Sequence, residues 1–206
     1  ALDLIYDRRS ENYDPLSTFL ELFEGVTAAS LREQREAELA TLSLSERLAR
    51  RIVDGNDKGL DADLDEAVKA AVIGRYQNTG QVCAAAKRFI VEAGIAEAFS
   101  KKFVAAVEAL KMGDPRDEAN YLGPMARFDL RDELHQQVEA TLAEGARLLL
   151  GGEKIAGQGN YYAVTVLGDV TPEMTAFRQE LFGPVAAITI ANDAAHALQL
   201  DRKSVV

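Results

Sequence analysis

The sequence has few cysteine, histidine and tryptophan residues. It contains one cysteine, two histidines and no tryptophan among 206 residues. A single cysteine excludes an internal disulfide framework and any zinc or iron–sulfur site built from several cysteines. No apolar run approaches the ~18 residues that a membrane span needs, and no secretory signal opens the chain. We therefore expect a cytoplasmic protein that does not contact a membrane.

Basic residues are also outnumbered, with 23 lysines and arginines against 33 aspartates and glutamates, for a net charge of −10. Nucleic-acid binding depends on neutralising phosphates, and anionic lipids likewise attract basic segments. The charge balance therefore argues against both kinds of partner. The composition, 48% hydrophobic and 27% charged, is that of a globular protein, and the length suits one domain or slightly more.

Residues 1–60 are rich in helix formers and show no strand pattern. Asp14 followed by Pro15 predicts the start of one helix, because aspartate caps helices and proline fits their first position. Ser43 and Glu46 have the spacing of a capping box and predict the start of a second helix. We therefore predict an all-helical extension over residues 1–60.

The pattern changes in residues 61–206, where Asp61 or Asp63 is expected to cap a helix. Further elements follow from hydrophobic periodicity. Helices are expected at 95–111, 125–144 and 193–200, and strands at 88–91, 147–150, 161–167 and 185–190. This alternation predicts an α/β layer with parallel strand pairing, so we take residues 61–206 as a second domain of α/β class.

Cys83, the only thiol, follows a polar turn that contains Asn78, Gly80 and Gln81. This turn is expected to place Cys83 near the start of a short helix, where backbone N–H groups could stabilise a thiolate and a developing oxyanion. A nucleophilic cysteine also needs a lowered pKa or a neighbouring base. Lone cysteines often pack as small hydrophobic residues, so the spacing alone leaves two alternatives open, a nucleophile and a buried inert thiol.

Glu180 and Phe182 precede a Gly-Pro turn. A carboxylate suits ribose hydroxyls and an apolar ring suits the face of a nicotinamide, although a charged loop before a strand is the plainer interpretation.

Other candidate sites are weaker. The glycines between residues 151 and 159 lie between two strand-like runs, which predicts turns and not a phosphate-binding loop. His135 and His196 have no carboxylates at metal-ligand spacing, so we predict no metal site.

Four motifs together make residues 61–200 resemble the aldehyde dehydrogenase superfamily. They are YQNTGQVCA at 76–84, DP at 114–115 followed by LGPM at 122–125, YYAVTVLGDV at 161–170, and ELFGPV at 180–185. They occur in the order and spacing of the family, and they are most similar to bacterial succinate-semialdehyde dehydrogenases. The resemblance implies an α/β fold, here a fragment of an aldehyde-dehydrogenase-like catalytic domain with a helical N-terminal extension.

The resemblance also implies a reaction, the oxidation of a small aldehyde such as succinic semialdehyde with NAD or NADP as cofactor. Cys83 would attack the aldehyde carbon to give a thiohemiacetal, with its own backbone N–H as part of the oxyanion hole. Hydride transfer to the cofactor would leave a thioester that water hydrolyses. Glu180 would hold the nicotinamide ribose, and Phe182 would bound the nicotinamide. The remaining residues of the nucleophile loop would be its scaffold: Asn78, Gly80 and Gln81.

The sequence departs from the family at both ends of the resemblance. The nucleotide-binding half and the general-base glutamate of the family lie upstream of the position of Asp61, and residues 201–206 do not fit the family's continuation. We therefore expect a truncated catalytic domain with impaired turnover. Apolar faces left without partners predict either a homo-oligomer or a tendency to aggregate.

Residues 1–66 resemble another protein, the cobalamin-dependent methionine synthase, over its linker and first cap helix. The motifs are IYDRR at 5–9, LELFEG at 20–25 and SERL at 45–48. The two resemblances meet at 61–67 (DADLDEA), which suggests a chimera. Two further alternatives stay open: residues 1–60 could form a non-catalytic helical interaction module, or the fused chain could have no selected function.

Overall fold

The structure is a computed structural model that describes residues 6, 9–10, 13–21, 28–54 and 59–203. It divides into two compact units, Ala1–Arg50 and Arg51–Val206. The first unit contains the helices α2 (Pro15–Glu21) and α3 (Ala28–Ala40), and the helix α4 (Leu44–Asp54) crosses the division. No helix in the described ranges is both long and apolar enough to cross a bilayer.

Both helix starts predicted for residues 1–60 are confirmed. The carboxylate of Asp14 accepts the N–H of Leu16 at 2.9 Å, and this hydrogen bond lowers the pKa of Asp14. Ser43 and Glu46 form the expected capping box. The Ser43 N–H donates to Glu46 Oε2 at 2.9 Å, and the Glu46 N–H donates to Ser43 Oγ at 3.4 Å. Two otherwise unpaired donors at the start of α4 are thereby satisfied.

The second unit is built on a four-stranded sheet with the order β1-β4-β3-β2. Its strands are β1 (Arg88–Glu92), β2 (Arg147–Leu150), β3 (Thr165–Gly168) and β4 (Val185–Ala191). The α/β class is confirmed, and β4 pairs in parallel with both β1 and β3. Parallel pairing is wrong for β2, which is antiparallel to β3. The two strands are joined by a loop without a helix, and such a connection suits antiparallel neighbours.

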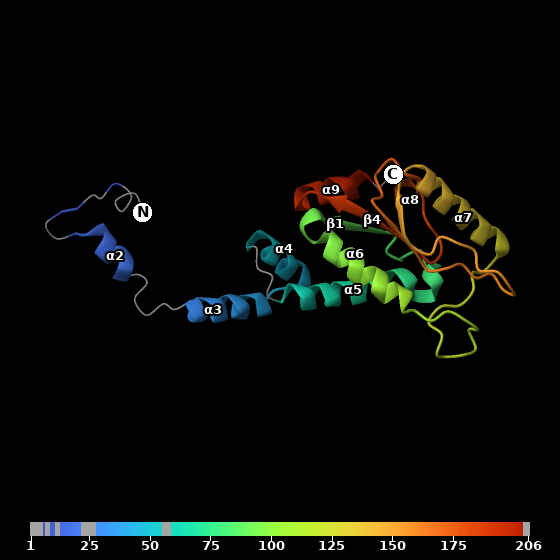
Figure 1. Ribbon diagram of the computed structural model, residues 1–206, viewed down its shortest axis with the longest axis horizontal. Helices are drawn as coiled ribbons and strands as arrows, with labels where there is room; N and C mark the ends of the chain where they lie inside the picture. Colours follow the sequence, from blue (N-terminus) through green and yellow to red (C-terminus); the bar gives the residue numbers. More distant parts are fainter. Residues whose placement is uncertain (1–5, 7–8, 11–12, 22–27, 55–58, 204–206) are drawn as a thin grey trace. The chain divides into compact units, whose positions relative to one another are not determined.

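Helices cover both faces of this sheet. One face carries α6 (Ala93–Glu108), which runs beside α5 (Leu60–Tyr76) in Figure 1. There Phe89 of β1 packs on Phe103 of α6, with ring centroids 5.1 Å apart. The Tyr76 hydroxyl donates to the carbonyl of Thr165 at 2.8 Å. The C-terminal end of α5 is thereby fixed to the sheet.

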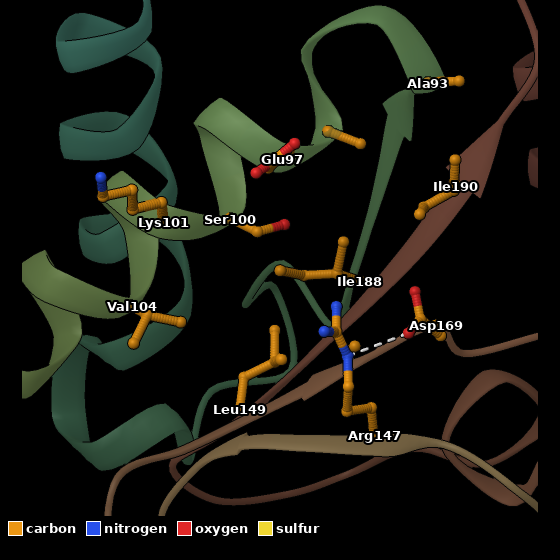
Figure 2. A pocket seen from close by; sticks show the side chains of 12 residues that line it. Ala93, Glu97, Ser100, Lys101, Val104, Arg147, Leu149, Asp169, Ile188 and Ile190 are labelled. Atoms are coloured by element: carbon orange, nitrogen blue, oxygen red, sulfur yellow. Dashed lines mark ion pairs between the residues drawn. The ribbon is translucent and has the colours of Figure 1, made fainter.

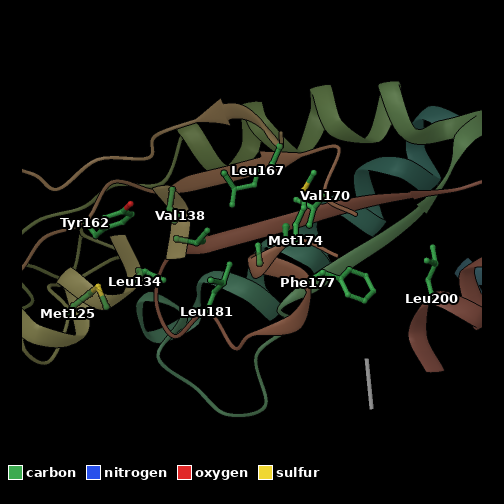
Figure 3. Close-up of a cluster of buried hydrophobic side chains, with 14 of the residues drawn as sticks. Met125, Leu134, Val138, Tyr162, Leu167, Val170, Met174, Phe177, Leu181 and Leu200 are labelled. Carbon is green, nitrogen blue, oxygen red and sulfur yellow. The ribbon is translucent and has the colours of Figure 1, made fainter. Parts of the chain in front are cut away.

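The main hydrophobic core lies on the other face, under α7 (Phe128–Ala143), α8 (Thr175–Arg178) and α9 (Ala194–Lys203). Figure 3 shows side chains of α7 and α8 gathered over the strands. Members of this cluster include Leu134, Val138, Leu167, Phe177 and Leu181, each at most 2% exposed. Burial of a side chain of this size contributes about 1.5–3 kcal/mol relative to exposure. The segment just before β4 is thus anchored in the core through Leu181.

The expected cap of α5 is wrong, because Asp61 and Asp63 both lie within its first turn. The N-cap is Gly59, at φ 79°. Asp63 pairs instead with Arg51, whose Nε lies 2.6 Å from Asp63 Oδ2, and the two side chains are 9% and 6% exposed. A Cβ at Gly59 would lie 2.5 Å from the guanidinium of Arg51. The Asp63 carboxylate therefore forms an ion pair with Arg51 and does not cap the helix.

Candidate active site

The two loops that carry the predicted site residues precede neighbouring strands. Cys83 lies before β1, and Glu180 lies before β4. The two strands are parallel, with Arg88 opposite Ala187. Because parallel neighbours begin at the same edge of a sheet, the loops that lead into them meet there. The structure brings Cys83 and Glu180 together at this edge, where both line a hollow of about 510 Å³.

The turn before Cys83 has an unusual backbone. After α5, the 3-10 helix η1 (Gln77–Gly80) contains consecutive left-handed residues, with φ 52° at Asn78, 57° at Thr79 and 70° at Gly80. At Gly80 a Cβ would lie 2.2 Å from the carbonyl oxygen of Gly183. The absence of a side chain therefore lets the backbone of the Cys83 loop touch the backbone of the Glu180 loop.

Side-chain hydrogen bonds fix this turn to residues 122–126, the Leu-Gly-Pro-Met-Ala segment. Thr79 Oγ1 accepts the N–H of Gly123 at 3.1 Å, and Gln81 Oε1 accepts the N–H of Ala126 at 2.8 Å. The side-chain amide of Asn78 donates to the carbonyl of Gln81 at 3.2 Å. These contacts hold the backbone of the turn and engage the polar side-chain atoms of Thr79 and Gln81. Thr79 was not singled out by the sequence, which offers no signal for its contact 44 residues away.

Cys83 lies in a short turn, closed by a hydrogen bond from the Ala85 N–H to the carbonyl of Val82 at 3.1 Å. The expected helix start at Cys83 is wrong. The N–H of Ala86 bonds to the carbonyl of Gly74 at 2.9 Å, and this bond leads the chain directly into β1. Cys83 therefore does not lie at the N-terminus of a helix. The buried-thiol alternative is also contradicted, because Cys83 is exposed.

Lys87 contacts both loops, and no sequence motif indicated it as a site residue. Its Nζ donates to the carbonyls of Val82 and Cys83, both at 3.0 Å. The same Nζ lies 2.9 Å from Glu180 Oε1 and 5.9 Å from the centre of the Phe182 ring. The side chain of Lys87 is 14% exposed, whereas that of Glu180 is 54% exposed. The ammonium of Lys87 thus contacts the turn that contains Cys83, the Glu180 carboxylate and the Phe182 ring.

Arg75, also missed, anchors the Glu180 loop from within the protein. Its Nη2 donates to the carbonyls of Leu181, at 2.7 Å, and Gly183. The side chain is fully buried, and burial lowers its pKa to about 10, which leaves it charged at neutral pH. The nearby Tyr76 and Glu180 oppose this shift. A buried cation therefore fixes the carbonyls that follow Glu180.

The two histidines and the glycines after β2 were weaker candidates. His135 Nδ1 lies 3.1 Å from the Tyr162 hydroxyl, and His196 Nδ1 accepts the N–H of Asn192 at 3.1 Å. Across the described residues, no group of three or more histidines, cysteines or carboxylates could hold a metal ion. Gly151 and Gly152 have positive φ angles in the connection between β2 and β3, so the turn prediction is confirmed.

A second hollow, of about 620 Å³, lies on the α6 face of the sheet (Figure 2). Its floor includes Leu149, Ile188 and Ile190. At its rim Arg147 pairs with Asp169 at 3.1 Å. None of the predicted catalytic or cofactor-binding residues lines it, whereas Cys83 and Glu180 both line the hollow described above.

Comparison with known proteins gives a consistent result. The aldehyde dehydrogenase family matches residues 60–204. A protein of Escherichia coli (strain K12) named succinate semialdehyde dehydrogenase, with NAD(P)+ in its name, is 79% identical over 144 residues, which are 70% of this chain and 31% of that protein. A succinate-semialdehyde dehydrogenase from Mycobacterium ulcerans (strain Agy99), with NADP(+) in its name, is 48% identical over 68% of this chain and 30% of its own length.

Solved structures agree with these sequence matches. An NAD-dependent aldehyde dehydrogenase from Sinorhizobium meliloti has 37% identity and a TM-score of 0.67, over 68% of this chain and 28% of its own. The chain thus spans about a third of the length of the proteins that it matches.

Proposed function

Because the chain belongs to the aldehyde dehydrogenase family, we propose that its second unit carries the thiol and the nicotinamide-contacting residues of an NAD(P)+-dependent aldehyde-oxidising site. The substrate we propose is succinic semialdehyde, since relatives at 79% and 48% identity are named for it. The observation that carries the proposal is the exposed Cys83 beside Glu180 in one hollow.

In this site the thiolate of Cys83 attacks the aldehyde carbon. A C–S bond forms, the C=O π bond opens, and the oxygen takes the negative charge. The N–H of Cys83 donates a hydrogen bond to this oxygen. When bound, NAD(P)+ supplies the acceptor for the hydride that leaves this carbon. The acyl group then rests on Cys83 as a thioester. Water cleaves the C–S bond, which releases the acid and restores the thiol.

The residues present fit the nicotinamide end of such a cofactor. Glu180 is half exposed and offers two acceptor oxygens that suit ribose hydroxyls. Phe182 follows two residues later, and its ring and the Glu180 carboxylate both lie near the ammonium of Lys87. We propose that Glu180 binds the nicotinamide ribose and that the Phe182 side chain lies against the nicotinamide ring. Asn78, Gly80 and Gln81 act as scaffold in this proposal, through the hydrogen bonds and the close backbone approach of their turn.

We also propose that the 206-residue chain turns over slowly by itself. Among the described residues that line the hollow, the carboxylates are Glu180 and Asp201. Glu180 is paired with Lys87, so it is poorly suited to activate a water. General-base catalysis contributes about 10²–10⁴-fold to a rate. Formation of NAD(P)H at an ordinary enzymatic rate, about 1–10³ s⁻¹, would contradict this part of the proposal.

Adduct formation at Cys83 tests the proposal without requiring turnover. We expect succinic semialdehyde to slow the alkylation of Cys83 by iodoacetamide, because a thiol held as a thiohemiacetal cannot be alkylated. The rate is measured by intact mass spectrometry of the full chain. Succinate, which has the same carboxylate without the aldehyde, is the matched control. Equal protection by both compounds, or by neither, would overturn the assignment of Cys83 as nucleophile.

We further propose that residues 1–60 are a separate helical segment that is similar to the methionine synthase linker and was joined to the dehydrogenase segment. The start of the family match at residue 60 supports this boundary, as does the division into units near residue 50. A transcript that spans the codons for residues 50–80 is expected from cells that carry the gene. Failure to amplify it, while each flanking segment amplifies, would contradict a genuine fusion.

A further inference from the structure

We propose that Lys87 is a positioning residue that aims the backbone N–H of Cys83 at the oxygen of the bound aldehyde. The inference rests on the function proposed above and deepens it. It assigns to Lys87 a role in aldehyde binding that acts through the backbone of the Cys83 turn. Three observations carry it: the hydrogen-bond partners of Lys87, the planarity of the peptide between Val82 and Cys83, and the low exposure of the ammonium.

The ammonium of Lys87 has three N–H donors and four acceptors within hydrogen-bond distance. The carbonyls of Val82 and Cys83 lie at 3.0 Å each, Glu180 Oε1 at 2.9 Å, and the carbonyl of Ala85 at 3.4 Å. Such hydrogen bonds are charge-assisted, so they are stronger than neutral ones. Because the side chain is only 14% exposed, water offers little replacement for these partners. Removing the ammonium would leave the carbonyls of Val82, Cys83 and Ala85 without their cation.

The hydrogen bond from Lys87 to the Val82 carbonyl fixes the orientation of the Cys83 N–H. The carbonyl of Val82 and the N–H of Cys83 belong to one planar trans peptide, so they point in opposite directions. By holding the carbonyl, Lys87 turns the N–H of Cys83 away from itself. This N–H is the donor proposed for the developing oxyanion. Lys87 thus acts on the aldehyde through the orientation of one peptide plane.

Glu180 supports this arrangement from the other side. Its carboxylate accepts from the same ammonium at 2.9 Å, beside the bonds to the Val82 and Cys83 carbonyls. Loss of Glu180 should therefore affect nucleotide binding more than aldehyde binding, whereas loss of Lys87 should affect aldehyde binding directly. This difference separates a positioning role for Lys87 from general support of the site.

The test compares Lys87→Met, Lys87→Arg and Glu180→Gln with the wild-type chain, by the concentration of succinic semialdehyde that halves the alkylation rate of Cys83. For Lys87→Met we expect this concentration to rise about tenfold, because a misaligned Cys83 N–H would forfeit one hydrogen bond to the oxygen of the adduct. Lys87→Arg keeps the charge and should recover part of the loss. Glu180→Gln should stay within about threefold of wild type, because the carbonyl bonds remain.

The alkylation rate without aldehyde provides an internal control, because alkylation by iodoacetamide requires no oxyanion donor. Lys69→Met, on the exposed side of α5, is the matched surface control. If Lys87→Met does not fold, Lys87→Gln replaces it and is expected to shift in the same direction. Wild-type protection together with unchanged protection in the folded Lys87 variant would overturn this inference alone. Absence of protection in the wild type would overturn the proposed function as well.

Discussion

Replacement of Asp63 by alanine is expected to lower the free energy of unfolding of the second unit by about 3–5 kcal/mol, the usual cost of removing one partner of a buried ion pair. Asp63 and Arg51 are each less than a tenth exposed and their charged groups lie 2.6 Å apart. Without the carboxylate, the Arg51 guanidinium would remain packed against Gly59 and would lose its ion pair with Asp63. Urea unfolding followed by circular dichroism measures the loss.

Two variants make the result interpretable. Asp65→Ala removes an exposed carboxylate from the same helix, one that pairs with Lys102 at 2.6 Å, and it should cost far less because solvent screens that pair. The double variant Asp63→Ala with Arg51→Met removes both charges and should recover much of the stability. A loss in Asp63→Ala no greater than that in Asp65→Ala would contradict the buried ion pair.

The second large effect is expected for Gly80→Ala. Gly80 has a φ of 70°, and an added Cβ would lie 2.2 Å from the carbonyl oxygen of Gly183 and 3.1 Å from that of Arg75. Both obstacles are backbone atoms, so the loops must separate. The left-handed conformation adds about 1–3 kcal/mol of strain for a residue with a side chain. We expect the free energy of unfolding to fall by more than about 2 kcal/mol.

Gly157→Ala is the matched control, because Gly157 also has a positive φ, 118°, but no atom lies within 4 Å of an added Cβ. It should therefore report backbone strain without the clash. Hydrogen exchange at residues 181–183 should accelerate in Gly80→Ala and stay unchanged in Gly157→Ala. Similar stability and exchange in the two variants would show that the Cys83 and Glu180 loops are not in contact.

Local patterns predicted most elements, because their signals lie within a few residues, although the strand expected at 161–167 is limited to Thr165–Gly168. The capping box of Ser43 and Glu46 is complete within one turn, and the strand at 147–150 was predicted with its exact bounds. The cap at Asp63 failed because Arg51, twelve residues earlier, competes for the same carboxylate. The helix at Cys83 failed because Ala86 bonds to Gly74 and enters the sheet.

The sequence indicated which residues belong to the candidate site, but it did not indicate the contacts that bring them together. The motif at 76–84 and the motif at 180–185 indicated Cys83, Glu180 and Phe182 by resemblance. Their common edge depends on the parallel register of β1 and β4, which no local pattern contains. Lys87 and Arg75 reach partners about 93 and 106 residues away. Such contacts appear only once the strands are paired, which explains why both residues were missed.

Protection of Cys83 by nicotinamide mononucleotide tests most directly whether Cys83, Glu180 and Phe182 form one site. This compound carries the ribose and the ring for which Glu180 and Phe182 offer partners, whereas AMP carries the same phosphate and ribose with adenine. Alkylation of Cys83 in the full chain is followed by mass spectrometry at equal, millimolar concentrations of each. We expect nicotinamide mononucleotide to slow alkylation several-fold and AMP to leave it unchanged. Equal effects of the two compounds, or no effect of either, would contradict a shared site.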